Sequence, residues 1–246
     1  MKPSKKIKTR DKELKAKKRL VIIFIGPPGA GKGTQSNLLA DKLSLYYLET
    51  SKILEEKFKE GNKRKSIKAG GKKYFIEKEK KLWREGILCS PPFVSYLIKD
   101  KIKEIFKMGE SLILAGSPRT LYEGKEVMPL LEKLYGRENI KVILIKLSAE
   151  SSIFRNSHRR ICELMRHPII YTEETIYLTK CPLDGSRLER RESLDNPETI
   201  KVRLKEYRER TYPLIDYFKK RGLKIKEVSG SGSVAEVFEE VLKAIK

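Results

Sequence analysis

Short apolar runs recur along the chain and alternate with longer stretches in which apolar positions follow a helical period. The runs cover residues 20–25, 46–48, 112–115, 140–147 and 223–228. Apolar runs of this length are typical of buried strands, and the intervals between them are long enough for crossover helices. The pattern therefore predicts an α/β fold in which helices cover both faces of a five-stranded parallel sheet.

The alternation breaks between residues 162 and 196, where prolines, Gly185 and mixed polar residues show no clear helical period. We expect an inserted lid at this place, over residues 161–196. A new helix should begin at Asn196-Pro197-Glu198, because asparagine caps helices, proline suits the first turn and glutamate favours the positive end of the helix.

Charge separates the first residues from the rest of the chain. Residues 1–19 hold ten basic and two acidic side chains and few apolar ones, so we expect a disordered tail and a folded domain over residues 20–246. The formal net charge of +22 over 246 residues predicts attraction to polyanions such as phosphates, RNA or acidic lipid surfaces. A second basic region, residues 57–84, fits a solvated helical face and loop at least as well as a nucleic-acid patch.

Two further features of composition narrow the class of protein. No apolar run approaches the roughly 18 residues needed to span a bilayer, and the three cysteines are too few for a disulfide framework. We therefore expect a cytoplasmic protein without membrane contact, whose cysteines bind a metal or pack in the interior.

The strongest chemical signal follows the first predicted strand directly. Residues 26–35 read Gly-Pro-Pro-Gly-Ala-Gly-Lys-Gly-Thr-Gln, which contains the G-x-x-x-x-G-K core of a phosphate-binding loop and opens a predicted helix. Glycines let backbone N–H groups converge on phosphate oxygens, and the helix terminus adds partial positive charge. Lys32 supplies a mobile charge for the phosphate, so the segment predicts a nucleotide site.

This loop departs from the general motif, because Gly33 stands between Lys32 and Thr34. Gly-x-Pro-Gly-x-Gly-Lys-Gly-Thr resembles the signature of adenylate kinases and related nucleoside monophosphate kinases. Further segments match that family in the same order, and together they cover the chain from about residue 20 to its C-terminus. They are Thr50, Gly86-Ile87-Leu88, Gly116-Ser117-Pro118-Arg119-Thr120, Arg155-x-x-x-Arg159-Arg160, Arg191, Arg203 and Thr211-x-Pro213-Leu214-Ile215.

The resemblance implies a role for each matching residue. ATP would bind to Gly29, Ala30, Gly31, Lys32, Gly33, Thr34 and Arg155. The acceptor nucleotide would bind to Thr50, Ile87, Leu88, Cys89, Gly116, Ser117, Pro118, Arg119 and Glu123. The charge of the transferred phosphoryl group would be stabilised by Lys32, Arg119, Arg159, Arg191 and Arg203, whose guanidinium forks match phosphate oxygens. Of these, Arg191 lies one residue further from Thr199 than the family pattern has it.

The resemblance also implies an organisation of the chain and a set of partners. A core of residues 20–49, 87–160 and 197–246 would carry an acceptor-binding segment, residues 50–86, and the lid, residues 161–196. We expect a P-loop three-layer sandwich that acts as a monomer and uses magnesium with ATP.

Three residues depart from the family pattern. Ala115 replaces the aspartate that helps to position hydrated magnesium, and Glu55 replaces an arginine for the acceptor phosphate. Glu123 replaces the glutamine that reads adenine, and a carboxylate only accepts hydrogen bonds whereas the adenine edge offers one donor and one acceptor. Guanine offers two donors, so the acceptor base is left open.

The predicted lid carries a candidate zinc site. Cys162, Cys181 and Asp184 resemble three of the four ligands in zinc-bearing adenylate kinase lids, but Met165 stands at the fourth position. His167 lies two residues further on and can complete the set, because neutral imidazole binds zinc well. The alternative is a lid that has lost its metal and packs these side chains.

Three hypotheses follow from the sequence. The first is reversible phosphoryl transfer from ATP to AMP, giving two ADP. The second keeps the reaction and changes the acceptor to GMP or another nucleoside monophosphate. The third is a nucleotide-binding protein of low turnover whose basic tail contacts RNA.

Overall fold

The computed structural model describes residues 19–60 and 65–246. The basic tail that the sequence predicts lies outside these residues, apart from Arg19. The Nη1 of Arg19 donates a hydrogen bond of 2.9 Å to the carbonyl oxygen of Phe106, and its guanidinium lies 3.9 Å from the centroid of the Phe106 ring. Among the described residues, no helix is long and apolar enough to cross a bilayer.

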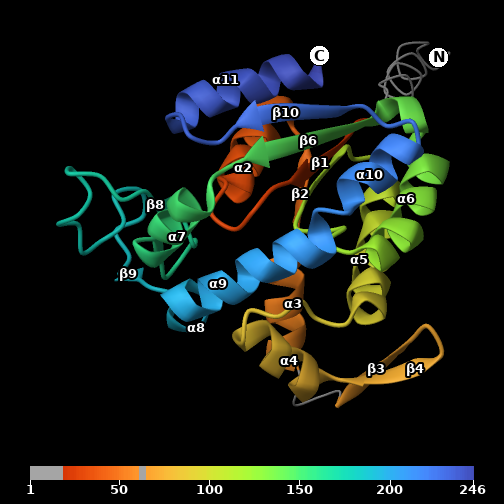
Figure 1. The fold of residues 1–246 in the computed structure, drawn as a ribbon, viewed down its shortest axis with the longest axis horizontal. Coiled ribbons are helices and arrows are strands. Elements are labelled where there is room, and N and C mark those ends of the chain that lie inside the picture. Colours follow the sequence, from red (N-terminus) through yellow and green to blue (C-terminus); the bar gives the residue numbers. More distant parts are fainter. Residues whose placement is uncertain (1–18, 61–64) are drawn as a thin grey trace, which may run out of the picture.

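A parallel sheet forms the centre of the molecule (Figure 1), as the sequence predicts. Its order is β10-β6-β1-β5-β2, and every neighbouring pair is parallel. The predicted strands are confirmed to within two residues at each end: β1 (Val21–Ile25), β2 (Tyr46–Glu49), β5 (Leu112–Ala115), β6 (Ile140–Lys146) and β10 (Ile225–Ser229).

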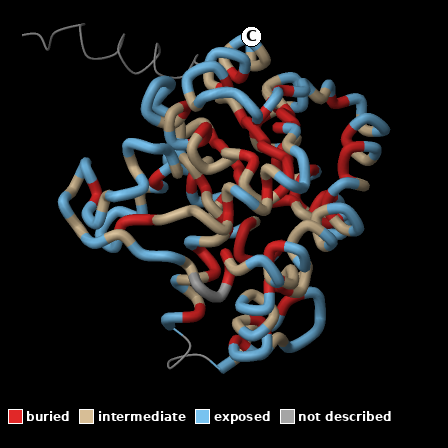
Figure 2. Tube along the Cα trace, turned by 60° about the vertical axis from the view of Figure 1, so that its left-hand side comes forward, coloured by how far each residue is buried: buried red, intermediate tan, exposed pale blue. Residues whose placement is uncertain are grey.

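The central strand β1 is buried on both faces. Successive side chains of a strand point to opposite faces, so Val21 and Ile23 join one apolar cluster while Ile22 and Phe24 join the other. Helices α5 (Pro91–Lys107), α6 (Leu121–Tyr135) and α10 (Leu214–Lys220) cover the first face. Helices α2 (Lys32–Leu43) and α11 (Val234–Ile245) cover the second, and the two layers keep the sheet at the buried centre of the chain (Figure 2).

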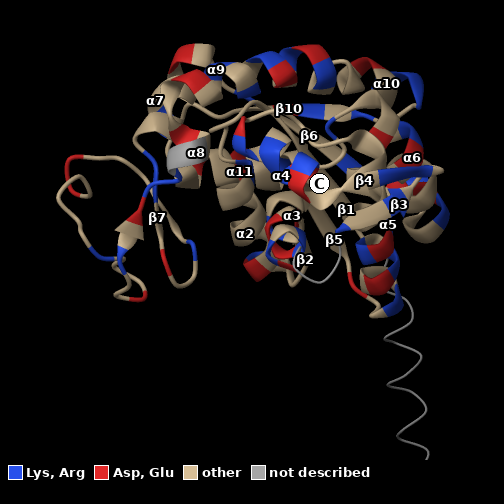
Figure 3. Ribbon diagram, turned by 90° about the horizontal axis from the view of Figure 1, so that it is seen from below, with Lys and Arg blue, Asp and Glu red and all other residues tan. Residues whose placement is uncertain are grey.

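The segment between β2 and α5 contains α3 (Thr50–Lys59), β3 (Ser66–Ala69), β4 (Lys72–Phe75) and α4 (Ile76–Arg84). The antiparallel hairpin β3-β4, whose turn is Gly70-Gly71, was not predicted from the sequence. Lysines and arginines lie along β3, β4 and α4 (Figure 3). The predicted solvated helical face is therefore a helix with a basic hairpin before it.

The segment after α7 (Ala149–Ser157) forms a small antiparallel sheet of β7 (Arg160–Cys162), β8 (Pro168–Ile169) and β9 (Leu188–Glu189). A single turn, α8 (Glu192–Asp195), then leads to α9 (Pro197–Glu206). The Asn196 cap is confirmed, because its side chain accepts a hydrogen bond of 2.8 Å from the N–H of Thr199. Short helical turns at η2 (Arg137–Asn139) and η3 (Tyr207–Thr211) complete the fold.

Candidate active site

The phosphate-binding loop joins the end of β1 to the start of α2. Gly31 lies just before the helix with φ 87°, in the left-handed region that favours glycine, and α2 begins without a side-chain cap. The Nζ of Lys32 donates hydrogen bonds of 2.7 Å to the carbonyl oxygens of Gly26 and Pro27, so the loop curls around the ammonium group. The uncapped N–H groups of the first turn suit a bound anion.

A cleft of about 880 Å³ opens above this loop, at the carboxyl ends of the parallel strands. It brings together residues that lie far apart in the sequence, and nearly all of the predicted nucleotide-binding residues line it. These are Gly29, Ala30, Gly31, Lys32, Gly33, Thr34, Thr50, Ile87, Leu88, Cys89, Gly116, Pro118, Arg119, Glu123, Arg155, Arg159, Arg191 and Arg203. Ser117 is buried behind the cleft and does not line it.

Four cationic side chains converge in the cleft. Burial lowers the pKa of Lys32 well below its ordinary value, and the charges of Arg119, Arg203 and Arg159 lower it further. Burial, with the charges of Arg191 and Arg159, lowers the pKa of Arg203 to about 9. Mutual repulsion of this kind is what a bound polyphosphate would relieve, so the cleft is built for a highly charged anion.

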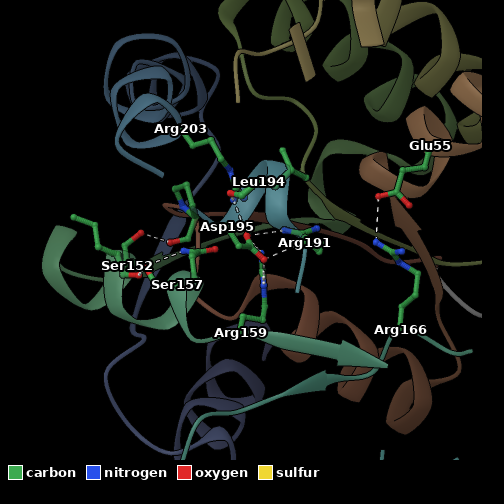
Figure 4. A network of polar contacts seen from close by, with 12 residues as sticks. Glu55, Ser152, Ser157, Arg159, Arg166, Arg191, Leu194, Asp195 and Arg203 are labelled. Carbon is green, nitrogen blue, oxygen red and sulfur yellow. Dashed lines mark hydrogen bonds and ion pairs between the residues drawn. The ribbon is translucent and has the colours of Figure 1, made fainter. Parts of the chain in front are cut away.

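One carboxylate holds three of the arginines (Figure 4). The side chain of Asp195, only 4% exposed, accepts hydrogen bonds from Nε of Arg159 at 3.1 Å and from Nη2 at 2.5 Å. It also accepts from Nε of Arg191 and from Nη1 of Arg203, both at 3.3 Å. The sequence did not single out Asp195, because its place before Asn196 is explained by the start of a helix.

Arg119 lies in the turn between β5 and α6, and Glu123 lies in the first turn of α6. Gly116 has φ 103°, in the region that favours glycine, and a Cβ atom there would lie 2.6 Å from Nη2 of Arg119, so a larger residue would strain the backbone and displace the guanidinium. One carboxylate oxygen of Glu123 accepts hydrogen bonds from Ser117 Oγ at 2.8 Å and from the N–H of Arg119 at 2.9 Å. Burial raises the pKa of Glu123, although the backbone hydrogen bond from Arg119 and the one from Ser117 partly offset that effect.

Thr50 begins α3 at the edge of the same cleft. Its side chain is buried, and its Oγ1 has no hydrogen-bond partner among the described residues. A buried hydroxyl without a partner is costly, so this position suits a bound ligand.

Glu55, the second departure from the family pattern, lies one turn further along α3. Its Oε1 accepts a hydrogen bond of 3.3 Å from Nη2 of Arg166, which belongs to the loop between β7 and β8 (Figure 4). Arg166 has φ 58°, an uncommon conformation for a residue with a side chain. The pair joins the two segments that the sequence predicts to close over the substrates.

The four predicted metal ligands also come together. The Sγ of Cys162 lies 3.0 Å from Oδ2 of Asp184, and Nδ1 of His167 lies 3.5 Å from Cys162 Sγ and 3.6 Å from Cys181 Sγ. The four ligand atoms all lie within 4.8 Å of one another. Met165 is exposed, unlike the buried Cys162 and Cys181.

Comparison with known proteins agrees with this arrangement. The family model described as "Adenylate kinase" matches residues 24–223. Adenylate kinase of Caldicellulosiruptor bescii is 35% identical over 230 residues, which are 91% of this chain and 98% of that protein. Adenylate kinase of Methanothrix thermoacetophila is 32% identical over 226 residues, which are 91% of this chain and 97% of that protein. The fold, the ordered motifs and these matches together place the chain in the adenylate kinase family.

Proposed function

We propose that this protein transfers a phosphoryl group reversibly from ATP to AMP, giving two ADP. The observation that carries the proposal is the convergence of Lys32, Arg119, Arg159 and Arg203 on one cleft beside the phosphate-binding loop. Membership of the adenylate kinase family supports the same reaction.

Phosphoryl transfer depends on positioning and on neutralising charge more than on covalent chemistry. Gly29 to Thr34 and Arg155 would hold ATP, and Arg119 would hold the acceptor phosphate. Lys32, Arg159, Arg191 and Arg203 would stabilise the charge of the phosphoryl group in transfer, because fixed cations in a water-poor site need no reorganisation during the reaction. The residues that close over the cleft, 50–86 and 161–196, would exclude water and limit hydrolysis.

When it is bound with ATP, magnesium neutralises part of the negative charge of the phosphates. The cleft offers oxygen donors that fit a hard cation, since the hydroxyl of Thr34 lines it at the first turn of α2 and the carboxylate of Glu49 lines it at the end of β2.

The preference for one acceptor base over another depends on Glu123. An ionised carboxylate only accepts hydrogen bonds and matches the two donors of guanine, whereas a neutral carboxyl group offers one donor and one acceptor and matches adenine. Burial raises the pKa of Glu123, whereas the hydrogen bonds from the N–H of Arg119 and from Ser117 favour the ionised carboxylate. The comparison of AMP with GMP as acceptors therefore tests the role of Glu123 directly.

We also propose a structural zinc ion in the lid, held by Cys162, His167, Cys181 and Asp184. Two thiolates, one imidazole and one carboxylate are a donor set that zinc accepts, and the ligand atoms are already grouped. By analogy with the family, we propose a monomer in the cytoplasm; a polyanion contact through residues 1–19 remains a separate proposal.

Steady-state formation of ADP tests the function directly. ATP and magnesium are supplied with AMP, GMP, CMP or UMP in separate assays, and Lys32→Ala serves as the control for contaminating kinases. We expect turnover with AMP that Lys32→Ala lacks. Preference for GMP would make Glu123 a determinant of guanine specificity. Absence of any turnover that depends on Lys32 would contradict the proposed activity.

A further inference from the structure

Glu49 ends strand β2 directly beside Ala115, which ends strand β5. The two residues are partners in the parallel register of the sheet. Neighbouring strands lie about 4.8 Å apart, and parallel strands bring their carboxyl ends to the same edge. A carboxylate on Glu49 can therefore reach the part of the cleft beside Ala115, where the methyl group offers no ligand.

The other acidic residues that line the cleft are engaged or lie elsewhere. Glu123 accepts hydrogen bonds from Ser117 Oγ and from the N–H of Arg119. Glu206 accepts from the N–H of Leu88 at 3.0 Å and pairs with Arg210 at 2.7 Å. Asp41 lies exposed in the third turn of α2, away from the phosphate-binding loop. Among the described residues, Glu49 is thus the carboxylate of the cleft that is best placed to contact a bound ligand.

The surroundings of Glu49 leave it accessible. Its side chain is 29% exposed, and its nearest ion-pair partner among the described residues is Lys52, 3.8 Å away and itself 53% exposed. Its carboxylate also accepts a hydrogen bond from the hydroxyl of Ser51. Burial lowers the pKa of Arg119 and of Arg159, and the negative charge of Glu49 partly offsets that effect in both. The carboxylate of Glu49 therefore lies within electrostatic reach of the side chains that would hold phosphate.

We propose that Glu49 positions the hydrated magnesium ion of Mg-ATP, in place of a carboxylate at residue 115. Magnesium gives up its waters reluctantly and is bound through one or two carboxylates together with substrate phosphates. A carboxylate at this edge accepts hydrogen bonds from such waters and offsets the charge of the ion. The proposal rests on the proposed function, because it needs ATP in the cleft.

The test measures metal binding without turnover. Manganese(II) replaces magnesium, a non-hydrolysable ATP analogue fills the cleft, and the electron paramagnetic resonance signal of the free ion gives the affinity. We expect Glu49→Gln to weaken manganese binding to the protein–nucleotide complex by about 10–100-fold, since partners that orient metal ligands have effects of that size. Binding of the analogue without metal should stay at the wild-type level.

Two further variants make the test decisive. Asp41→Asn removes another carboxylate of the same cleft and should leave manganese binding unchanged. Ala115→Asp, added to Glu49→Gln, moves the carboxylate to the neighbouring strand and should restore most of the lost affinity. Unchanged manganese binding in Glu49→Gln, or an equal loss in Asp41→Asn, would overturn the role of Glu49. A wild-type protein that binds no nucleotide even without metal would instead overturn the proposed function.

Discussion

The carboxylate of Asp195 accepts two hydrogen bonds from the guanidinium of Arg159, one from Nε and one from Nη2. This bidentate pair fixes the plane of the guanidinium, and the same carboxylate reaches Arg191 and Arg203. Asp195 is therefore a positioning residue, because it orients cations that would contact phosphate and is absent from the residues that line the cleft.

We expect Asp195→Asn to lower kcat by about 10–100-fold, since a misplacement of about 1 Å has effects of that order. The free energy of unfolding should fall by about 1–3 kcal/mol, because the three arginines lose their shared counter-charge. Steady-state kinetics and urea unfolding measure the two effects. Asp216→Asn, an exposed change on α10, is the matched control. A wild-type kcat in Asp195→Asn would contradict this role, because it would show that the arginines keep their orientation without the carboxylate.

The stability that Asp195 contributes should depend on pH. Burial acts to raise its pKa, but the charges of Arg159 and Arg191 and their hydrogen bonds outweigh burial and hold the pKa below its ordinary value. A group with a depressed folded-state pKa stabilises the protein above its unfolded-state pKa, about 3.9 for aspartate, and loses that contribution as the pH falls further. The difference in free energy of unfolding between wild type and Asp195→Asn should therefore shrink below about pH 4. A constant difference across that range would contradict the ion pairing.

Strand positions were predictable because burial on both faces leaves a continuous apolar run, as in Val21–Ile25. The hairpin β3-β4 was missed because its lysines and its position at the surface leave no such run. Asp195 and Glu49 were missed for a different reason. Asp195 pairs with Arg159, 36 residues away in the sequence, and Glu49 lies beside Ala115 only because β2 pairs with β5. A local sequence pattern contains neither relationship.

The ion pair between Glu55 and Arg166 should favour the closed arrangement of the two inserted segments. The side chain of Arg166 is 41% exposed, so the pair is worth about 0.2–1 kcal/mol, or a factor of about 1.5–5 in the closing equilibrium. We expect Glu55→Gln and Arg166→Gln each to raise the KM for AMP by such a factor, and to make it less sensitive to salt.

The double variant discriminates a direct pair from two separate effects. If the two side chains act through each other, Glu55→Gln with Arg166→Gln should raise the KM no further than either change alone. Multiplicative effects would show that each residue acts independently. Lys101→Gln, which breaks an exposed pair with Glu104 on α5, is the control for a general effect of surface charge.

Removal of zinc should destabilise the lid. We expect about one zinc ion per chain by atomic absorption, and a lower Tm after treatment with a chelator, because a structural site contributes its binding free energy to folding. Cys181→Ser should bind less zinc and respond less to the chelator, whereas Cys89→Ser, outside the cluster, should respond like wild type. A fully folded wild-type protein that contains no zinc and ignores the chelator would contradict the proposed site.

The pairing of Arg159 with Asp195 has a consequence for how the chain tolerates change. Arg159 immediately precedes β7, and Asp195 lies in the turn that follows β9, so their contact ties the two ends of the intervening segment together at its base. We therefore expect the length and sequence of what lies between to be able to vary while Arg159, Arg191 and Arg203 keep their places around Asp195. On this basis we expect the segment to act as an exchangeable module, so that the corresponding segment of another adenylate kinase can be grafted between residues 160 and 190.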